Sequence, residues 1–288
     1  MWLDIQSLDV PVDTGNSDIW VLNITEDHAS WPAVESVLAA HGEVSTQYFK
    51  VFSKQEQDEA EWLKIGASGH HGFPQPEDDY FELTYDSASC RRCGITGAQV
   101  NPFRLRSEPK AKHSQFLQLN WVFDELFVRR DAQSGIESAG ITGPKFVPAV
   151  INKNGEPSRE VSQMKVDYIL PSSLDVSCLQ TVTCMPDNEE PPTPPGLRSV
   201  WSDSLPYCHR VKYHLRTRNQ FEFERTAFEG TPDFVKSHEW FGSGGQAFRL
   251  LIVSRAFRQL VVANKWRGLY FEPIALVDKP RRAGSTGR

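Results

Sequence analysis

The chain has 288 residues, of which 39% are hydrophobic and 24% are charged, and its formal net charge at pH 7 is −6. This composition is typical of a globular protein with one large or two ordinary domains, and no apolar run approaches the roughly 20 residues that span a bilayer. The negative charge disfavours a nucleic-acid partner, because phosphate binding needs clustered Lys and Arg, and the basic clusters at 104–112 and 210–218 are short and mixed.

The N-terminus and the cysteines indicate the compartment. Residues 1–5 include the acidic Asp4 where a secretory signal would have basic residues, and they lack an apolar core. The five cysteines are an odd number, which favours thiols or metal ligands over a disulfide framework. We therefore expect a cytoplasmic protein.

The first motif along the chain surrounds Asp13. Residues 12–21 read Val-Asp-Thr-Gly-Asn-Ser-Asp-Ile-Trp-Val, which resembles the signature of pepsin-like aspartic proteases. That chemistry needs two carboxylates that share one proton, and the sequence has no second Asp-Thr-Gly or Asp-Ser-Gly. The pattern therefore favours two strands joined by a turn at 14–16.

Short elements and loops are predicted up to residue 85. Apolar residues at helical spacing, with Pro32 near the start, predict a helix over 30–40. Strands are predicted over 48–52 and 80–85, because Tyr80 to Tyr85 alternates in polarity. The charged segment 55–62 fits a helical turn or a loop.

Residues 66–79 have no periodicity and are predicted to form a loop. Its His70-His71 pair fits an exposed polar surface better than a metal site. The next motif, Cys90-Arg91-Arg92-Cys93-Gly94, is typical of a zinc knuckle, in which Gly in a left-handed turn lets backbone N–H groups point at the sulfurs. One such pair is half of a tetrahedral site.

Strands are predicted over 102–106 and within 115–128, and the polar segment 149–164 is the predicted domain boundary. The Pro-rich, acidic stretch within 185–206 is predicted to be an extended loop. After it, a second knuckle is degenerate: Cys208 corresponds to Cys93, but Leu205 stands in place of Cys90 and His209 in place of Gly94. The Gly-rich residues 242–245 precede a strand and so indicate a tight turn instead of a phosphate-binding loop.

One segment of the chain is repeated. Residues 123–148 align with residues 248–273 at a constant offset and without a gap. The matched pairs are Phe123 and Phe248, Leu126 and Leu251, Val128 and Val253, Arg130 and Arg255, Gly143 and Gly268, Phe146 and Phe271, and Pro148 and Pro273. Each copy reads as a strand, a short helix, a turn containing Gly and a second strand interrupted by Pro.

The repeat predicts an α+β fold of two related halves, each a small mixed or antiparallel sheet with a strand-helix-strand unit. The expected division is 1–160, with the Cys-x-x-Cys-Gly knuckle, and 161–288, with the degenerate knuckle. The second helix, capped by Ser254 and continuing to Asn264, is the most regular in the chain.

These motifs together resemble the double-CXXCG-motif family of bacterial proteins. The resemblance rests on Cys90 to Gly94, on 119–128, and on 240–249 with 271–273, and it leaves residues 1–89 without a counterpart. It implies a non-catalytic, immunity-like protein that binds and neutralises a protein toxin, similar to those that act on toxins exchanged between myxobacterial cells.

The resemblance also implies a zinc site to which each knuckle gives two thiolates. In this chain Cys90, Cys93 and Cys208 are three of the expected ligands, with His209 or Cys184 as the fourth. Zinc is the expected cofactor if the site is retained. If it is not, Cys178 and Cys184 are ordinary thiols.

Two other functions stay open. A hydrolase could use Asp13 in an aspartic-type site, or His70 and His71 with Asp78 and Asp79. A zinc-ribbon module associated with nucleic acid is disfavoured by the charge and by the missing cysteine. No spacing rule identifies a binding surface or an oligomeric state.

Overall fold

The computed structural model describes residues 12–13, 21–22, 24–25, 27–41, 50–110, 114–185, 205–215 and 220–278. The chain divides into two compact units, Met1–Tyr48 and Phe49–Arg288. None of the helices within the described ranges has the length and apolar character needed to cross a membrane.

The first unit contains a strand pair and a helix. Strands β1 (Val12–Asp13) and β2 (Val21–Leu22) pair antiparallel, and α2 spans Trp31–His41. The predicted strands around Asp13 and the predicted helix over 30–40 are therefore confirmed. The turn predicted at 14–16 lies outside the described residues.

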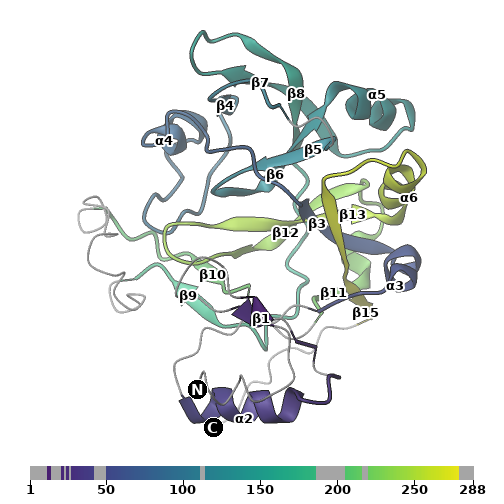
Figure 1. Ribbon diagram of the computed structural model, residues 1–288. Helices are drawn as coiled ribbons and strands as arrows, with labels where there is room; N and C mark the ends of the chain where they lie inside the picture. The colour runs from purple at the N-terminus through teal and green to yellow at the C-terminus, as the bar shows by residue number, and fades with distance from the viewer. Residues whose placement is uncertain are drawn as a thin grey trace. The chain divides into compact units, whose positions relative to one another are not determined.

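The second unit holds two large sheets (Figure 1). The six-stranded sheet has the order β14-β3-β13-β12-β10-β9 and the five-stranded sheet the order β4-β7-β8-β6-β5, while β11 and β15 form a separate pair. Most neighbours are antiparallel, but β4 runs parallel to β7, β10 to β12 and β11 to β15. The elements are α3 (Lys54–Glu59), β3 (Trp62–Ala67), α4 (Tyr80–Thr84), β4 (Arg104–Leu105), β5 (Phe116–Leu119), β6 (Val122–Arg129), α5 (Arg130–Ser138), β7 (Pro144–Ile151), β8 (Pro157–Val166), β9 (Thr181–Thr183), β10 (Val211–Tyr213), β11 (Glu222–Glu224), the 3-10 helix η1 (Arg225–Phe228), β12 (Phe234–Phe241), β13 (Phe248–Ser254), α6 (Arg255–Ala263), β14 (Leu269–Pro273) and β15 (Ala275–Val277).

The two aligned segments form the same series of elements. The first copy is β6, α5 and β7, and the second is β13, α6 and β14. Their turn glycines have nearly the same backbone conformation, with φ of 107° at Gly143 and 104° at Gly268. The α+β fold of two related halves is therefore confirmed.

In each copy, the two strands pair with a central strand that lies outside the aligned segment. Strand β8 lies between β6 and β7, and β3 lies between β13 and β14. The Cα partners across the central strands are Leu126, Met164 and Phe146 in one sheet, and Leu251, Ile65 and Phe271 in the other. The register is equivalent, so β3, which precedes both copies, completes the second half.

Because β3 precedes both copies but belongs to the second half of the fold, the two halves of the fold do not correspond to two continuous halves of the sequence. The division expected between residues 160 and 161 falls inside β8, and β3 from the expected first half is a central strand of the second. The predicted boundary segment 149–164 instead contains the β7–β8 hairpin.

The halves contact each other reciprocally through their turns. In one junction the Phe234 amide donates to the Thr142 carbonyl at 3.2 Å, and in the other the Gln115 amide donates to the Arg267 carbonyl at 3.0 Å. Each turn therefore packs on the strand that precedes the other copy.

Both turn glycines are expected to be required. A Cβ at Gly143 would lie 2.7 Å from the Phe234 carbonyl oxygen, and one at Gly268 would lie 2.5 Å from the Phe116 carbonyl oxygen. We expect alanine at either position to lower the free energy of unfolding by about 2–4 kcal/mol, because the backbone must shift and φ is unfavourable for alanine. Gly140, at φ 69° with open space around it, is the matched control and should cost about 1 kcal/mol. Urea unfolding measures the decrease in the free energy of unfolding for the three variants. Equal decreases would mean that the close contacts of Gly143 and Gly268 do not contribute to stability.

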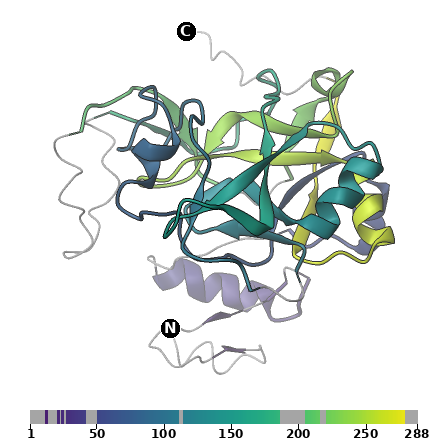
Figure 2. The same cartoon turned by 90° about the horizontal axis from the view of Figure 1, so that it is seen from above.

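One apolar core joins the two copies. Leu126 and Leu251, which are matched, lie in the same buried cluster. The rings of the matched Phe123 and Phe248 are 5.4 Å apart. Helices α5 and α6 lie side by side (Figure 2), and Gly135 of α5 leaves room for the Trp266 ring, which a Cβ would approach to 2.7 Å.

A buried ion cluster also connects the sheets. Lys236 of β12 pairs with Asp124 and Glu125 of β6, at 3.3 and 2.5 Å, and all three residues are buried. Burial raises the pKa of Glu125, although the charge of Lys236 opposes the shift. The attraction between Lys236 and the two carboxylates offsets the free-energy cost of removing these charges from water. Loss of one partner would leave an unpaired buried charge.

Asp233 is expected to make the stability depend on pH. Partial burial disfavours its carboxylate, but hydrogen bonds from Ser254 and Thr142 outweigh this and lower its pKa. Because the folded pKa is the lower one, this stabilisation is present above the unfolded value of about 3.9 and is lost as pH falls through the folded pKa. Asp233→Asn should cost about 1 kcal/mol at pH 7 and much less at pH 2–3, which urea unfolding at both pH values tests.

Two predicted strands were wrong, and one strand was not predicted. The strand predicted over 80–85 is helix α4, whose buried residues Phe81 and Thr84 have helical spacing. The described part of 48–52, residues 50–52, contains no strand. Strand β3 was not predicted. The charged segment 55–62, for which a helical turn or a loop was expected, contains most of helix α3, which begins with a capping box between Ser53 and Glu56. The loop predicted within 185–206 lies largely outside the described residues.

Candidate metal centre

The first knuckle has the predicted conformation. The Cys90 amide donates to the Ile95 carbonyl at 2.8 Å, and the Gly94 amide donates to the Cys90 carbonyl at 2.8 Å. Gly94 is left-handed at φ 78°, and the Ile95 amide points at the Cys93 sulfur. Amide hydrogen bonds to sulfur favour the thiolate that binds a metal.

A second knuckle of the same form is built around Cys208. The Cys184 amide donates to the Arg210 carbonyl at 3.0 Å, and the His209 amide donates to the Cys184 carbonyl at 3.1 Å. His209 is left-handed at φ 58°, and the Arg210 amide points at the Cys208 sulfur. Each bond has its counterpart in the first knuckle, so Cys184 takes the place of Cys90 although residues 185–207 separate it from Cys208.

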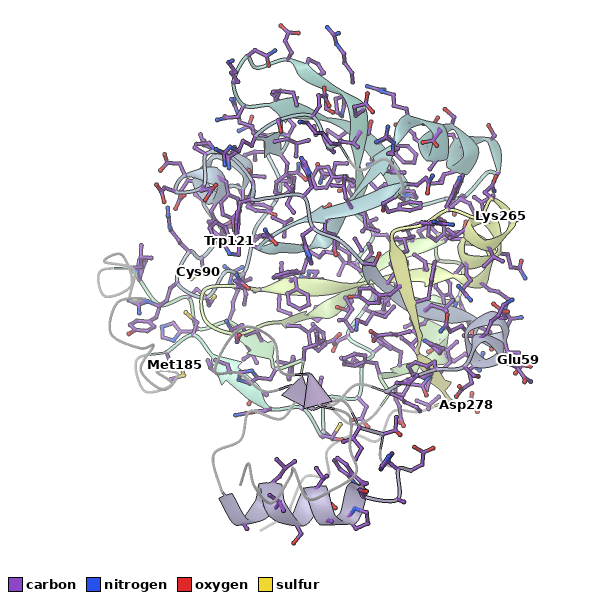
Figure 3. The ribbon with its side chains drawn as sticks, viewed as in Figure 1. Glu59, Cys90, Trp121, Met185, Lys265 and Asp278 are labelled. Atoms are coloured by element: carbon purple, nitrogen blue, oxygen red, sulfur yellow. The ribbon has the colours of Figure 1, made fainter. Side chains whose placement is uncertain are left out.

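The two knuckles bring four sulfurs together. The sulfurs of Cys90, Cys93, Cys184 and Cys208 all lie within 4.8 Å of one another. Cys90 and Cys184 are 4.0 Å apart and Cys93 and Cys208 are 3.6 Å apart. Sulfurs about 2.3 Å from a tetrahedral ion are about 3.8 Å from each other, so the four cysteines fit such an ion. Figure 3 marks the position of Cys90.

Three of the four predicted ligands meet in this centre. Cys90, Cys93 and Cys208 belong to it, and the fourth member is Cys184, the alternative to His209. His209 instead supplies the left-handed turn residue of the second knuckle. Cys178 is exposed and lies outside the group. Sequence spacing left the fourth ligand open between His209 and Cys184, because the second Cys-x-x-Cys is interrupted.

The pKa values of the thiols are shifted in different directions. Burial, reinforced by neighbouring thiols, raises the pKa of Cys93 and of Cys184. Burial also disfavours the Cys208 thiolate, but hydrogen bonds from Arg210 and from neighbouring thiols outweigh it and lower the pKa of Cys208 to about 7. Because metal ligands are thiolates, binding an ion here would release protons.

Cationic side chains surround the centre. Lys212 is 2% exposed, and its Nζ donates to the carbonyls of Cys93 at 3.2 Å, Gln246 at 3.3 Å and Gly244. Arg210 donates to the carbonyls of Ala88 and Ile95. A divalent ion with four thiolates carries a net charge of −2, which these cations would offset.

The tip of the β12–β13 hairpin packs on the first knuckle. A Cβ at Gly94 would lie 2.6 Å from the Ala247 amide nitrogen, so only glycine allows this approach. The Gly-rich segment 242–245, predicted to be a tight turn, therefore forms the hairpin tip beside the cysteines.

The alternative catalytic residues do not form a comparable group. The His70 ring packs on Phe123, with centroids 5.9 Å apart, and His71 Nε2 lies 3.4 Å from the Ser107 carbonyl oxygen. Across the described ranges, the four cysteines are the one cluster of three or more His, Cys, Asp or Glu side chains arranged to hold a metal. The side chain of Asp13 lies outside the described atoms.

No protein-family model matches the chain, and no curated protein is similar to it.

Proposed function

We propose that the protein is a zinc-stabilised, non-catalytic binding protein of the immunity type, which neutralises a bacterial protein toxin. The observation that carries this proposal is the group of four cysteines, contributed by two equivalent knuckles, whose sulfurs all lie within 4.8 Å of one another. Residues Cys90, Cys93, Cys184 and Cys208 would hold the ion. When bound, zinc would cross-link the two knuckles.

The ligand set supports a structural role for the ion. Catalytic zinc sites keep one coordination position for water or substrate, whereas four protein thiolates fill a tetrahedral site. Soft thiolate ligands also favour zinc over magnesium or calcium. The centre would thus stabilise the loops that carry it.

An immunity role is supported by the resemblance to the double-CXXCG-motif family. In that pattern each knuckle supplies two thiolates, and here Cys184 and Cys208 supply the second pair in spite of their separation. The net charge of −6 would steer the protein toward a basic effector. The compartment expected for such a protein is the cytoplasm.

The metal is tested on the purified full chain. Elemental analysis should give one zinc per chain, and removal of zinc by a chelator should lower the melting temperature. A metal-free chain that melts at the same temperature with or without added zinc contradicts the zinc site.

Neutralisation is tested in cells. The chain is co-expressed with the toxin encoded beside its gene, and growth should recover while the two proteins co-purify. Persistent toxicity without a complex would refute the immunity role and leave the metal site standing.

A further inference from the structure

Trp121 occupies an unusual position at the tip of the β5–β6 hairpin. Its φ is 68°, a left-handed conformation that favours Gly or Asn over a large side chain. Trp121 is also 36% exposed, so part of the indole is accessible to a partner. Figure 3 labels its position. A strained backbone that presents an exposed indole is the kind of outlier that indicates a functional constraint.

Two other rings hold the indole in place. The Phe73 ring lies 4.4 Å from the Trp121 ring, and the Tyr80 ring stacks on it at 5.9 Å with an interplanar angle of 26°. The loop that carries Phe73 is fixed to the hairpin, because the Asn120 amide donates to the Gly72 carbonyl at 2.8 Å. Phe73, Tyr80 and Trp121 therefore form a pre-organised aromatic platform.

Acidic residues flank the platform. Glu77, Asp78 and Asp79 directly precede Tyr80 and are all exposed. Arg91 pairs with Glu82 at 2.6 Å, but in the described part of the chain no ion pair involves the three preceding carboxylates. Arg91 also donates to the Asp78 carbonyl, but the carboxylates outnumber it, so the segment that carries Tyr80 has a net negative charge.

The matched hairpin tip of the other half has a different environment. Gln246 corresponds to Trp121 at the offset of the repeat, and its tip packs on the first cysteine knuckle. The β12–β13 tip thus lies against the metal centre, whereas the β5–β6 tip presents an exposed aromatic residue. The two copies have acquired different roles at the same position of the fold.

We propose that the aromatic platform with its carboxylates is a docking surface for a basic protein partner. An apolar side chain of the partner covers the Trp121 ring, and Lys or Arg side chains pair with Glu77, Asp78 and Asp79. Tryptophan is among the residue types most enriched in binding hot spots. The adjacent carboxylates favour a partner whose contacting side chains are positively charged. This inference rests on the proposed function, because the toxin would be the partner.

The key variant is Trp121→Gly in the full chain. Glycine removes the ring and relieves the unfavourable φ, but it also loses the contacts of the ring with Phe73 and Tyr80, so the melting temperature of the variant is measured and binding is compared at a temperature at which both chains are folded. Tyr168→Ala is the matched control, since Tyr168 is 41% exposed and lies outside the platform. Glu77→Lys with Asp78→Lys tests the charge, and Glu137→Lys with Glu156→Lys changes two exposed carboxylates elsewhere.

A phage-displayed library of random peptides, selected on the immobilised full chain, tests the surface without the toxin. Recovered peptides should be basic and contain an apolar residue, and their affinity should fall at least about tenfold with Trp121→Gly and with the platform charge reversal. Both controls should bind as wild type does. Recovery of no peptides, of acidic peptides, or of peptides that bind Trp121→Gly equally well overturns the inference.

Toxin co-expression separates this inference from the proposed function. If the wild-type chain neutralises the toxin and Trp121→Gly does so equally, the docking surface is wrong and the function stands. If basic peptides need Trp121 but the wild-type chain does not neutralise the toxin, the surface stands and the immunity role fails. Loss of neutralisation in Trp121→Gly with an unchanged melting temperature supports both.

Discussion

Cys184→Ser is expected to abolish stoichiometric zinc binding and to lower the free energy of unfolding by more than about 3 kcal/mol. Loss of a structural metal is among the few single changes with effects this large, because metal binding energy is also folding energy. Cys184 is buried at 6% exposure, and its backbone reproduces both hydrogen bonds of Cys90. Serine keeps these backbone groups but replaces the sulfur with a hydroxyl, which is a poor zinc ligand, and so leaves three thiolates at the site.

His209→Gly is the decisive comparison. If His209 were the fourth ligand, glycine would remove zinc as serine does at Cys184. Because His209 instead occupies the left-handed turn position at φ 58°, glycine should retain one zinc per chain and leave the stability the same or higher. Cys178→Ser, at an exposed cysteine, should change neither quantity. Elemental analysis and urea unfolding of the three variants give the answer, and zinc retained in Cys184→Ser would rule out the four-cysteine centre.

The architecture of each half could be predicted because its determinants are local. The aligned Phe, Gly and Pro positions reflect buried strand positions and a turn that only glycine tolerates, and these survive at a constant offset. Gly143 and Gly268 illustrate this, since both have φ above 100° and both would place a Cβ against backbone. Such constraints leave a sequence signal whatever surrounds them.

The way the halves are completed could not be predicted. Strand β3 precedes both copies in the chain, yet its residues pair with β13 and β14, about 200 residues away. Its sequence Trp-Leu-Lys-Ile-Gly-Ala alternates only briefly and follows a charged helix, so propensity alone does not identify a central strand. Strand pairing between segments so far apart in the sequence depends on the whole fold and cannot be predicted from local sequence.

Three of the four cysteines in the candidate metal centre were predicted as ligands from the sequence, but the fourth ligand was left open between His209 and Cys184. Cys90 and Cys93 belong to a contiguous motif, but Cys184 reaches Cys208 only because β9 and β10 pair antiparallel and bring the strand ends together. The sequence placed His209 next to Cys208, which made it a natural candidate. The left-handed φ of His209 and the hydrogen bonds of Cys184 are backbone properties that residue spacing does not report.

A chain that begins at Phe49 is expected to keep the stability of the second unit, whereas a chain that begins at Ser68 should be unfolded. The first deletion removes only Met1–Tyr48, a separate compact unit. The second also removes β3, whose Leu63, Ile65 and Ala67 are at most 4% exposed in the core shared by both copies. Burial of Leu63 and Ile65 contributes about 1.5–3 kcal/mol each.

Removal of β3 would also break the backbone hydrogen bonds that it makes with β13 and β14, each of which contributes about 0.5–1.5 kcal/mol. The sum reaches the 5–15 kcal/mol that stabilises a typical domain. Circular dichroism and urea unfolding should therefore show a cooperative transition for the chain from Phe49 and none for the chain from Ser68. Leu63→Ala in the longer chain is the graded control and should cost about 2–5 kcal/mol. A cooperative transition in the chain from Ser68 would mean that β3 does not complete the second half, and the equivalence between β3 and β8 would then have no energetic basis.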